Sequence, residues 1–119
     1  MPVNLIFGAI LKLWAATPPA EIICEGKYPH HLQGVAGNPT DSLYWSFTTV
    51  LVKTDLTGRV LARREVPYHH GDLCLAGDRL YVAWSDCFNR PGADARVYIY
   101  EAADLSLLQV VSVPEVTFG

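Results

Sequence analysis

The run GDLCLAGDRLYVA, from Gly71 to Ala83, and the run GVAGNPTDSLYWS, from Gly34 to Ser46, decide the fold of this chain. Each run places short apolar segments on either side of a turn that contains glycine with asparagine or aspartate, residues that tolerate positive φ. Four residues keep one spacing: Gly34, Asp41, Leu43 and Tyr44 return 37 positions later as Gly71, Asp78, Leu80 and Tyr81. We therefore expect two copies of one unit that is built from strands and turns.

Both copies continue through the same landmarks. Each reaches an Asp-Leu pair (Asp55-Leu56 and Asp104-Leu105), and each closes on Val-Pro (Val66-Pro67 and Val113-Pro114). Turn residues separate short runs with β-type patterning. The predicted strands are 32–36, 43–47, 50–54 and 59–66 in the first unit, and 72–75, 79–84, 96–101 and 107–113 in the second. A further short β-type run covers 21–24. The expected fold class is all-β, with each unit a four-stranded antiparallel meander.

The run from Val50 to Arg63 resembles the outer strands of a propeller blade, and Gly71–Leu73 with Gly77–Ala83 resembles the inner strands. Over residues 25–119 the chain is similar to the NHL-like and lactonase-like six-bladed propellers. On this basis residues 21–67 are expected to form one blade, residues 68–114 a second, and residues 115–119 the start of a further blade. A ring normally closes with about four to eight blades, so the remaining blades of a longer chain are the expected partners. The alternative is a small sandwich of eight strands.

The first twenty residues differ from the rest of the chain. The segment from Val3 to Ala16 is almost wholly apolar and short, and Thr17-Pro18-Pro19-Ala20 then breaks any helix. The segment is too short to cross a bilayer, so we expect no stable membrane span. Residues 1–20 read as a signal-peptide-like segment, which predicts an exported protein, periplasmic or extracellular. The alternative is an amphipathic or buried N-terminal helix.

Composition narrows the possible partners. Half of the residues are hydrophobic and 18% are charged, which favours a folded domain over a disordered one. The net charge is −3 without any basic block, so we expect no nucleic-acid partner. Three cysteines are too few for a disulfide framework. The sequence also contains no glycine-rich phosphate loop and no metalloprotease motif, so no motif defines a reaction.

Candidate functional residues gather before the first strand of each unit. The doublets His30-His31 and His69-His70 both precede such a strand, and Gln33 stands 37 positions before His70. In a four-stranded meander, the loop between strands two and three emerges on the same side as the doublets. In the second unit this loop is long, from Ser85 to Ala95, and long loops on a rigid scaffold commonly carry function. We predict that a small-molecule ligand is bound by His30, His31, Gln33, His69, His70, Asp72, Asp86 and Asn89.

Two alternatives to ligand binding remain open. His70 and Asp72 are candidates for holding one divalent metal ion, because imidazole and carboxylate both suit zinc and similar ions. The resemblance to lactonase-like propellers would then imply a metal-dependent hydrolase or lyase, although the Glu, Asn and Asp set of that family is not matched here. In the other alternative the histidines only cap backbone groups and pack beside Tyr28 and Tyr68. The blades would then be an architectural array that mediates protein contacts, and no cofactor is certain.

Overall fold

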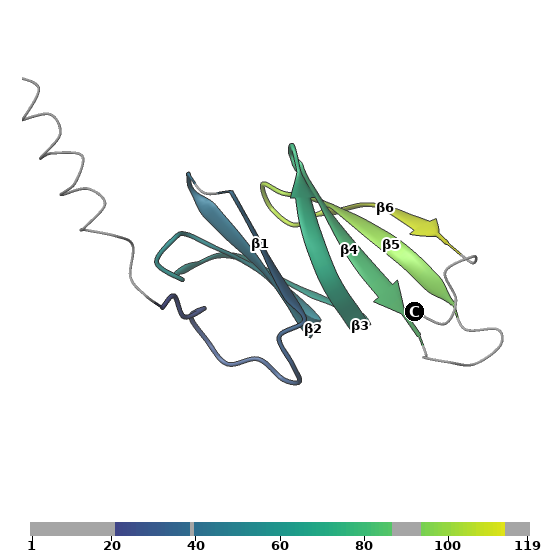
Figure 1. Cartoon of the computed structure of the whole chain (residues 1–119), viewed down its shortest axis with the longest axis horizontal. Helices are drawn as coiled ribbons and strands as arrows, with labels where there is room; N and C mark the ends of the chain where they lie inside the picture. Colours follow the sequence, from purple (N-terminus) through teal and green to yellow (C-terminus); the bar gives the residue numbers. More distant parts are fainter. Residues whose placement is uncertain (1–20, 39, 87–93, 114–119) are drawn as a thin grey trace, which may run out of the picture.

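The computed structural model describes residues 21–38, 40–86 and 94–113. These residues form six strands: β1 (Gly34–Asn38), β2 (Ser42–Thr54), β3 (Val60–Ala76), β4 (Arg79–Ser85), β5 (Ala95–Glu101) and β6 (Leu107–Ser112). The strands join in chain order into one antiparallel sheet that runs from β1 to β6 and does not close on itself (Figure 1). The expectation of an all-β fold is confirmed, and no helix occurs among the described residues.

Several predictions fall outside the described residues. They are the signal-peptide-like segment 1–20, the beginning of a further blade at 115–119, and Asn89 with most of the loop around it. Export therefore stays a prediction. Nowhere in the described ranges is there a helix of the length and apolarity needed to cross a membrane.

The observed strands differ from the predicted ones in three places. The run 21–24 is not a strand, because it pairs with none of the described strands; Ile22 and Cys24 instead pack in the cluster that contains Trp45. β1 begins at Gly34, two residues later than predicted. The predicted strands 43–47 and 50–54 are continuous in β2, and 59–66 and 72–75 are continuous in β3, so the sheet has six strands instead of eight.

β2 turns back on itself near Thr48, where φ is +44°. The Trp45 indole Nε1 donates a hydrogen bond of 2.9 Å to Thr54 Oγ1, although the two residues stand nine positions apart. Nine residues of extended strand would cover about 30 Å, so this contact requires a reversal between them. The part of β2 before Thr48 pairs with β1, and the part after it pairs with β3.

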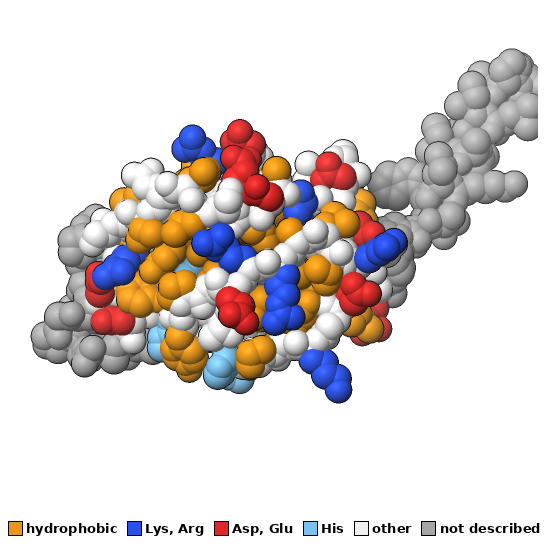
Figure 2. Space-filling model, turned by 180° about the vertical axis from the view of Figure 1, so that it is seen from behind, with side chains coloured by type: hydrophobic (Ala, Val, Ile, Leu, Met, Phe, Trp, Pro, Cys, Tyr) orange, Lys and Arg blue, Asp and Glu red, His pale blue; other side chains and the backbone are white. Residues whose placement is uncertain are grey.

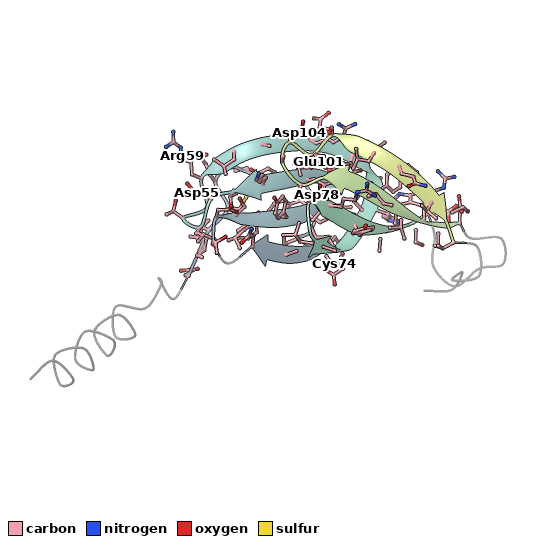
Figure 3. All side chains as sticks on the ribbon, turned by 90° about the horizontal axis from the view of Figure 1, so that it is seen from above. Asp55, Arg59, Cys74, Asp78, Glu101 and Asp104 are labelled. Atoms are coloured by element: carbon pink, nitrogen blue, oxygen red, sulfur yellow. The ribbon has the colours of Figure 1, made fainter. Side chains whose placement is uncertain are left out.

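β3 changes its partner along its length. Residues 60–65 pair with β2, whereas residues 70–76 pair with β4, and a register shift separates the two stretches; only His70 pairs with both strands, through Thr48 and Trp84. His69, with φ of +75°, lies in the intervening bend. The sheet therefore has a first half (β1, β2 and residues 60–66) and a second half (residues 70–76 with β4, β5 and β6), which lie side by side in Figures 1 and 3.

The larger hydrophobic core lies between these halves. Tyr44 and Leu51 from the first half join Leu80, Val82 and Tyr100 from the second in one buried cluster. The Tyr44 hydroxyl also donates a 2.9 Å hydrogen bond to the carbonyl of Ala102. Because successive strand residues point to opposite faces, the residues next to Tyr44 and Leu51 face away from this core. These residues are Trp45, Val50 and Val52, and they form a smaller cluster with Cys24.

One end of the sheet consists of turns. Figure 3 looks onto this end, where Asp55, Asp78, Glu101 and Asp104 are labelled. The Asp55 carboxylate accepts hydrogen bonds from the Thr57 hydroxyl at 2.7 Å and its backbone N–H at 2.9 Å, and these bonds lower the pKa of Asp55. Gly58 in the same turn has φ of +92°, a conformation that glycine adopts readily. The first Asp-Leu landmark therefore marks a turn, as the sequence predicts.

Candidate functional site

A pocket with a volume of ≈610 Å³ opens at the other end of the sheet. Its lining comes from the segment before β1, the bends of β2 and β3, the end of β4, the beginning of β5, and Val113. In an antiparallel sheet whose strands follow one another in order, these places all lie at the same end. Figure 2 shows histidine side chains beside hydrophobic ones along the lower edge of the molecule. Five of the residues predicted from sequence line this pocket: His30, His31, Gln33, His69 and His70.

His70 is the buried member of the group and has no exposed surface. Its Nδ1 lies 2.8 Å from the carbonyl oxygen of Pro67, and its Nε2 lies 2.7 Å from the Tyr100 hydroxyl. A carbonyl only accepts, so Nδ1 carries the ring proton and Nε2 accepts a hydrogen bond from Tyr100. Burial lowers the pKa of His70 to about 4, and the hydrogen bond to Pro67 opposes that shift. His70 is therefore neutral at physiological pH, with both ring nitrogens engaged.

Two of the remaining histidines, His30 and His69, lie against Tyr68, which is 55% exposed. The His30 ring meets the Tyr68 ring edge-on with centroids 5.2 Å apart, and the His69 ring lies 4.2 Å from it. His69 Nδ1 is also 3.0 Å from the carbonyl oxygen of Ser85, to which it donates as the Nδ1–H tautomer. The first histidine of each doublet has positive φ, +66° at His30 and +75° at His69. Positive φ is uncommon outside glycine, so each doublet changes the chain direction at its first histidine.

Gln33 connects the first doublet to the bend of β2. Its Nε2 donates a 3.1 Å hydrogen bond to Thr48 Oγ1, and the Thr48 hydroxyl donates a 3.1 Å bond to the carbonyl oxygen of His31. The Gln33 backbone N–H donates to Ser46 at 2.7 Å. These bonds fix the position of the exposed His31 at the rim of the pocket.

Trp84 and Arg96 form the other wall. Trp84 Nε1 donates a 2.6 Å hydrogen bond to the carbonyl oxygen of Tyr68, which joins the end of β4 to the bend of β3. The Arg96 guanidinium lies 5.0 Å from the centre of the Trp84 ring and pairs with Asp94 at 2.6 Å. Neither Arg96 nor Thr48 is predicted from the sequence. Arg96 could have been predicted from its position, because it is a cation directly after the long loop and lies in the strand that pairs with Trp84.

Both predicted carboxylates, Asp72 and Asp86, are absent from the pocket lining. Asp72 is exposed, and its Oδ1 accepts a 2.8 Å hydrogen bond from the backbone N–H of Leu73, so it does not line the pocket. It lies against Gly34, where an added Cβ would come within 2.1 Å of that oxygen. Asp86 holds the base of the long loop, because its Oδ1 accepts a 2.8 Å bond from the N–H of Asp94.

The metal hypothesis for His70 and Asp72 gains no support from these positions. Both ring nitrogens of His70 already make hydrogen bonds, and Asp72 is outside the pocket lining. Within residues 21–38, 40–86 and 94–113, no group of three or more His, Cys, Asp or Glu side chains is arranged to hold a metal ion.

No model of a known protein family matches the chain, and no curated protein matches it. Among solved structures, the crystal structure of the computationally designed Ika4 protein is similar, with 9% sequence identity and a TM-score of 0.48. The likeness covers 76% of this chain and 78% of that one. It is too weak to carry an argument about fold or function.

Proposed function

We propose that this chain supplies two neighbouring four-stranded blades of a propeller-like protein, and that the pocket at their histidine end binds a small organic ligand. The blade interpretation is supported by the reversal of β2 and the change of partner in β3. These two features divide the sheet into segments 34–38, 42–48, 50–54 and 60–66, followed by 70–76, 79–85, 95–101 and 107–112. A four-stranded sheet needs cover on its faces, and each set covers one face of the other through the core around Tyr44 and Leu80.

The ligand proposal rests on one observation: residues from distant parts of the sequence line the same pocket. The doublets His30-His31 and His69-His70 are far apart in sequence, yet they line one pocket together with Gln33. Its volume of ≈610 Å³ lies within the range of roughly 300–1,000 Å³ that is usual for small-molecule sites. Such sites combine apolar and aromatic walls with a few polar groups that fix orientation, and Tyr68 and Trp84 are the aromatic lining residues here.

The charges of the lining favour a neutral or anionic ligand. Arg96 lines the pocket, with its charge partly offset by the ion pair to Asp94, and none of the described lining residues is Asp or Glu. An amine would therefore find no counter-ion among them, whereas a carboxylate or hydroxyl could bond to Arg96, His31 or Gln33. Aromatic walls favour a flat ring or the apolar face of a sugar. The proposed ligand class is thus a flat aromatic acid, a nucleoside or a sugar.

His70 favours binding over turnover. Its ring is neutral, and both nitrogens are occupied by Pro67 and Tyr100, so acid–base work or metal ligation would require it to give up a hydrogen bond. In the proposed role, His70 holds the bend of β3 against β5 through Pro67 and Tyr100, and the exposed side chains recognise the ligand.

Saturation-transfer NMR on the full chain tests the proposal with four probes: benzoate, adenosine, methyl glucoside and the diamine putrescine. We expect signals from at least one flat or sugar probe and none from putrescine. Trp84→Ala should abolish those signals, because it removes a wall of the pocket. Tyr81→Ala is the matched control, since this half-buried aromatic residue does not line the pocket.

Binding that survives Trp84→Ala, or a preference for putrescine, would refute the proposed site. Elemental analysis of the purified protein addresses the alternative reaction. One tightly held divalent ion per chain would favour a metal-dependent hydrolase or lyase over a binding module.

A further inference from the structure

One face of the second half carries mostly apolar side chains that belong to neither hydrophobic cluster. The pairing registers place Cys74, Tyr81, Ile99 and Gln109 in one row across the strands, and Ala83, Val97 and Val111 in the next row. Residues paired across antiparallel strands project to the same side, and these rows alternate with the core row that contains Val82. We call these seven residues the outer face. Figure 3 shows Cys74 projecting away from the body of the sheet.

The internal repeat shows what covers such a face. Tyr44 and Ser46 stand 37 positions before Tyr81 and Ala83, so the outer face is the counterpart of the Tyr44 side of the first half. In the chain itself, the Tyr44 side packs against Leu80, Val82 and neighbouring residues of the second half. Among the described residues, no third set of strands packs on the outer face, where Cys74 and Ala83 are exposed, Tyr81 is half-buried and Ile99 is buried by its neighbours.

The surface of the second half that covers the Tyr44 side contains Leu80 and Val82, and the first half has an equivalent surface. Leu43, Trp45 and Phe47 stand 37 positions before Leu80, Val82 and Trp84, and with Val50 and Val52 they form what we call the aromatic face. We propose that a second copy of this chain docks its aromatic face onto the outer face. The contact is heterologous, because two different surfaces meet, and repetition of it gives a ring if the rotation closes and a filament if it does not. The proposal does not depend on the ligand proposed for the histidine pocket.

The aromatic face has a cover of its own that a second copy must displace. Tyr28 stacks on Phe47 with ring centroids 4.3 Å apart, and Ile22 and Cys24 pack nearby. This segment has no regular secondary structure, and a hollow of ≈370 Å³ remains between it and Trp45 and Phe47.

Sedimentation velocity of the full chain over a wide concentration range tests the inference. We expect species larger than the 13.1 kDa monomer to increase with concentration. Tyr81→Arg on the outer face and Phe47→Arg on the aromatic face should each give a monomer, and neither residue lines the histidine pocket. Leu43→Lys is a second aromatic-face variant in case Phe47→Arg does not fold. Leu108→Arg is the matched control, because Leu108 is 47% exposed on β6 and belongs to neither face.

Mixing distinguishes a heterologous contact from a symmetric one. Tyr81→Arg retains its aromatic face and Phe47→Arg retains its outer face, so an equimolar mixture should form a one-to-one dimer that neither variant forms alone. Tyr28→Ala should strengthen association of the otherwise unchanged chain, because it loosens the cover over Phe47.

Three results would overturn the proposal. The first is a chain that stays monomeric at every concentration. The second is association that persists in Tyr81→Arg or Phe47→Arg alone, since that requires a different surface. The third is a Tyr28→Ala variant that associates no more strongly than the original chain, since the segment would then not compete for the aromatic face.

Discussion

The buried histidine at the centre of the molecule should make the fold sensitive to mild acid. His70 is fully buried, with the Tyr98 ring 4.6 Å away and the Tyr100 hydroxyl bonded to its Nε2. Arg64 lies 5.8 Å from the centre of the Tyr100 ring and adds positive charge nearby. A second proton on His70 would break the hydrogen bond from Tyr100 and place a cation in a buried site. The folded state therefore resists protonation of this ring.

The sign and size of the effect follow from the pKa of His70. Burial lowers it from 6.5 to about 4 in the folded chain. Between these values the unfolded chain binds the proton and the folded chain does not, so stability falls as pH decreases. Each pH unit across that window costs about 1.4 kcal/mol, which amounts to roughly 3 kcal/mol by pH 4. Above about pH 7 the ring is neutral in both the folded and the unfolded chain, so His70 no longer lowers the stability.

Urea denaturation followed by tryptophan fluorescence, repeated from neutral pH down to about pH 4, measures this loss. His70→Asn is the informative variant, because its amide can still donate to Pro67 but does not titrate. It should be less stable at neutral pH and should lose much less stability on acidification than the original chain. His31→Asn is the control, because His31 is exposed, and it should follow the original chain.

Parallel loss of stability in His70→Asn and the original chain would refute this reasoning. If His70→Asn does not fold, NMR titration of the ring protons of the original chain gives the answer directly. A His70 ring that titrates near its ordinary pKa would show that the folded state does not resist protonation.

Three further outcomes are expected. Ser46→Ala should raise stability by up to about 1 kcal/mol, because the buried Ser46 hydroxyl has no hydrogen-bond partner among the described residues; chemical denaturation measures it. Gly58→Ala should lower the melting temperature much more than Gly77→Ala, because an added Cβ would lie 1.9 Å from a backbone oxygen at Gly58 and meets nothing within 4 Å at Gly77. Cys74 should be alkylated much faster than Cys24, because Cys74 is exposed whereas burial raises the pKa of the Cys24 thiol; peptide mapping after brief iodoacetamide treatment tests this.

Turn chemistry explains why most of the sheet could be predicted. Strands β4 and β5 were expected at 79–84 and 96–101 and are found at Arg79–Ser85 and Ala95–Glu101. Glycine and aspartate at fixed spacing mark the turns before and between such strands, and their conformational preferences are local. The reversal of β2 at Thr48 has no such marker, because a threonine with positive φ is held there by the contacts around it.

Long-range contacts explain what could not be predicted in the pocket. That the histidine doublets share one end of the sheet follows from the order of the strands, which the sequence reveals. The engagement of His70 by Tyr100 does not follow, because it depends on how the second half brings together side chains of β3 and β5 that are 30 residues apart. Asp72 was predicted as a site residue from its place at the start of an inner strand, yet it lies against Gly34 instead of lining the pocket.

Equivalent positions of the two repeat units have different roles in the pocket. Gln33 and His70 stand 37 positions apart, but Gln33 bonds to Thr48 at the rim whereas His70 is enclosed beside Tyr100. Burial on only one side of the repeat follows from the packing, because the Tyr98 and Tyr100 side of the second half faces the first half. A group with both ring nitrogens engaged serves the fold, so recognition falls to the exposed members, His31 above all. Substitutions at His31 should therefore change binding with little effect on stability, whereas substitutions at His70 should change both.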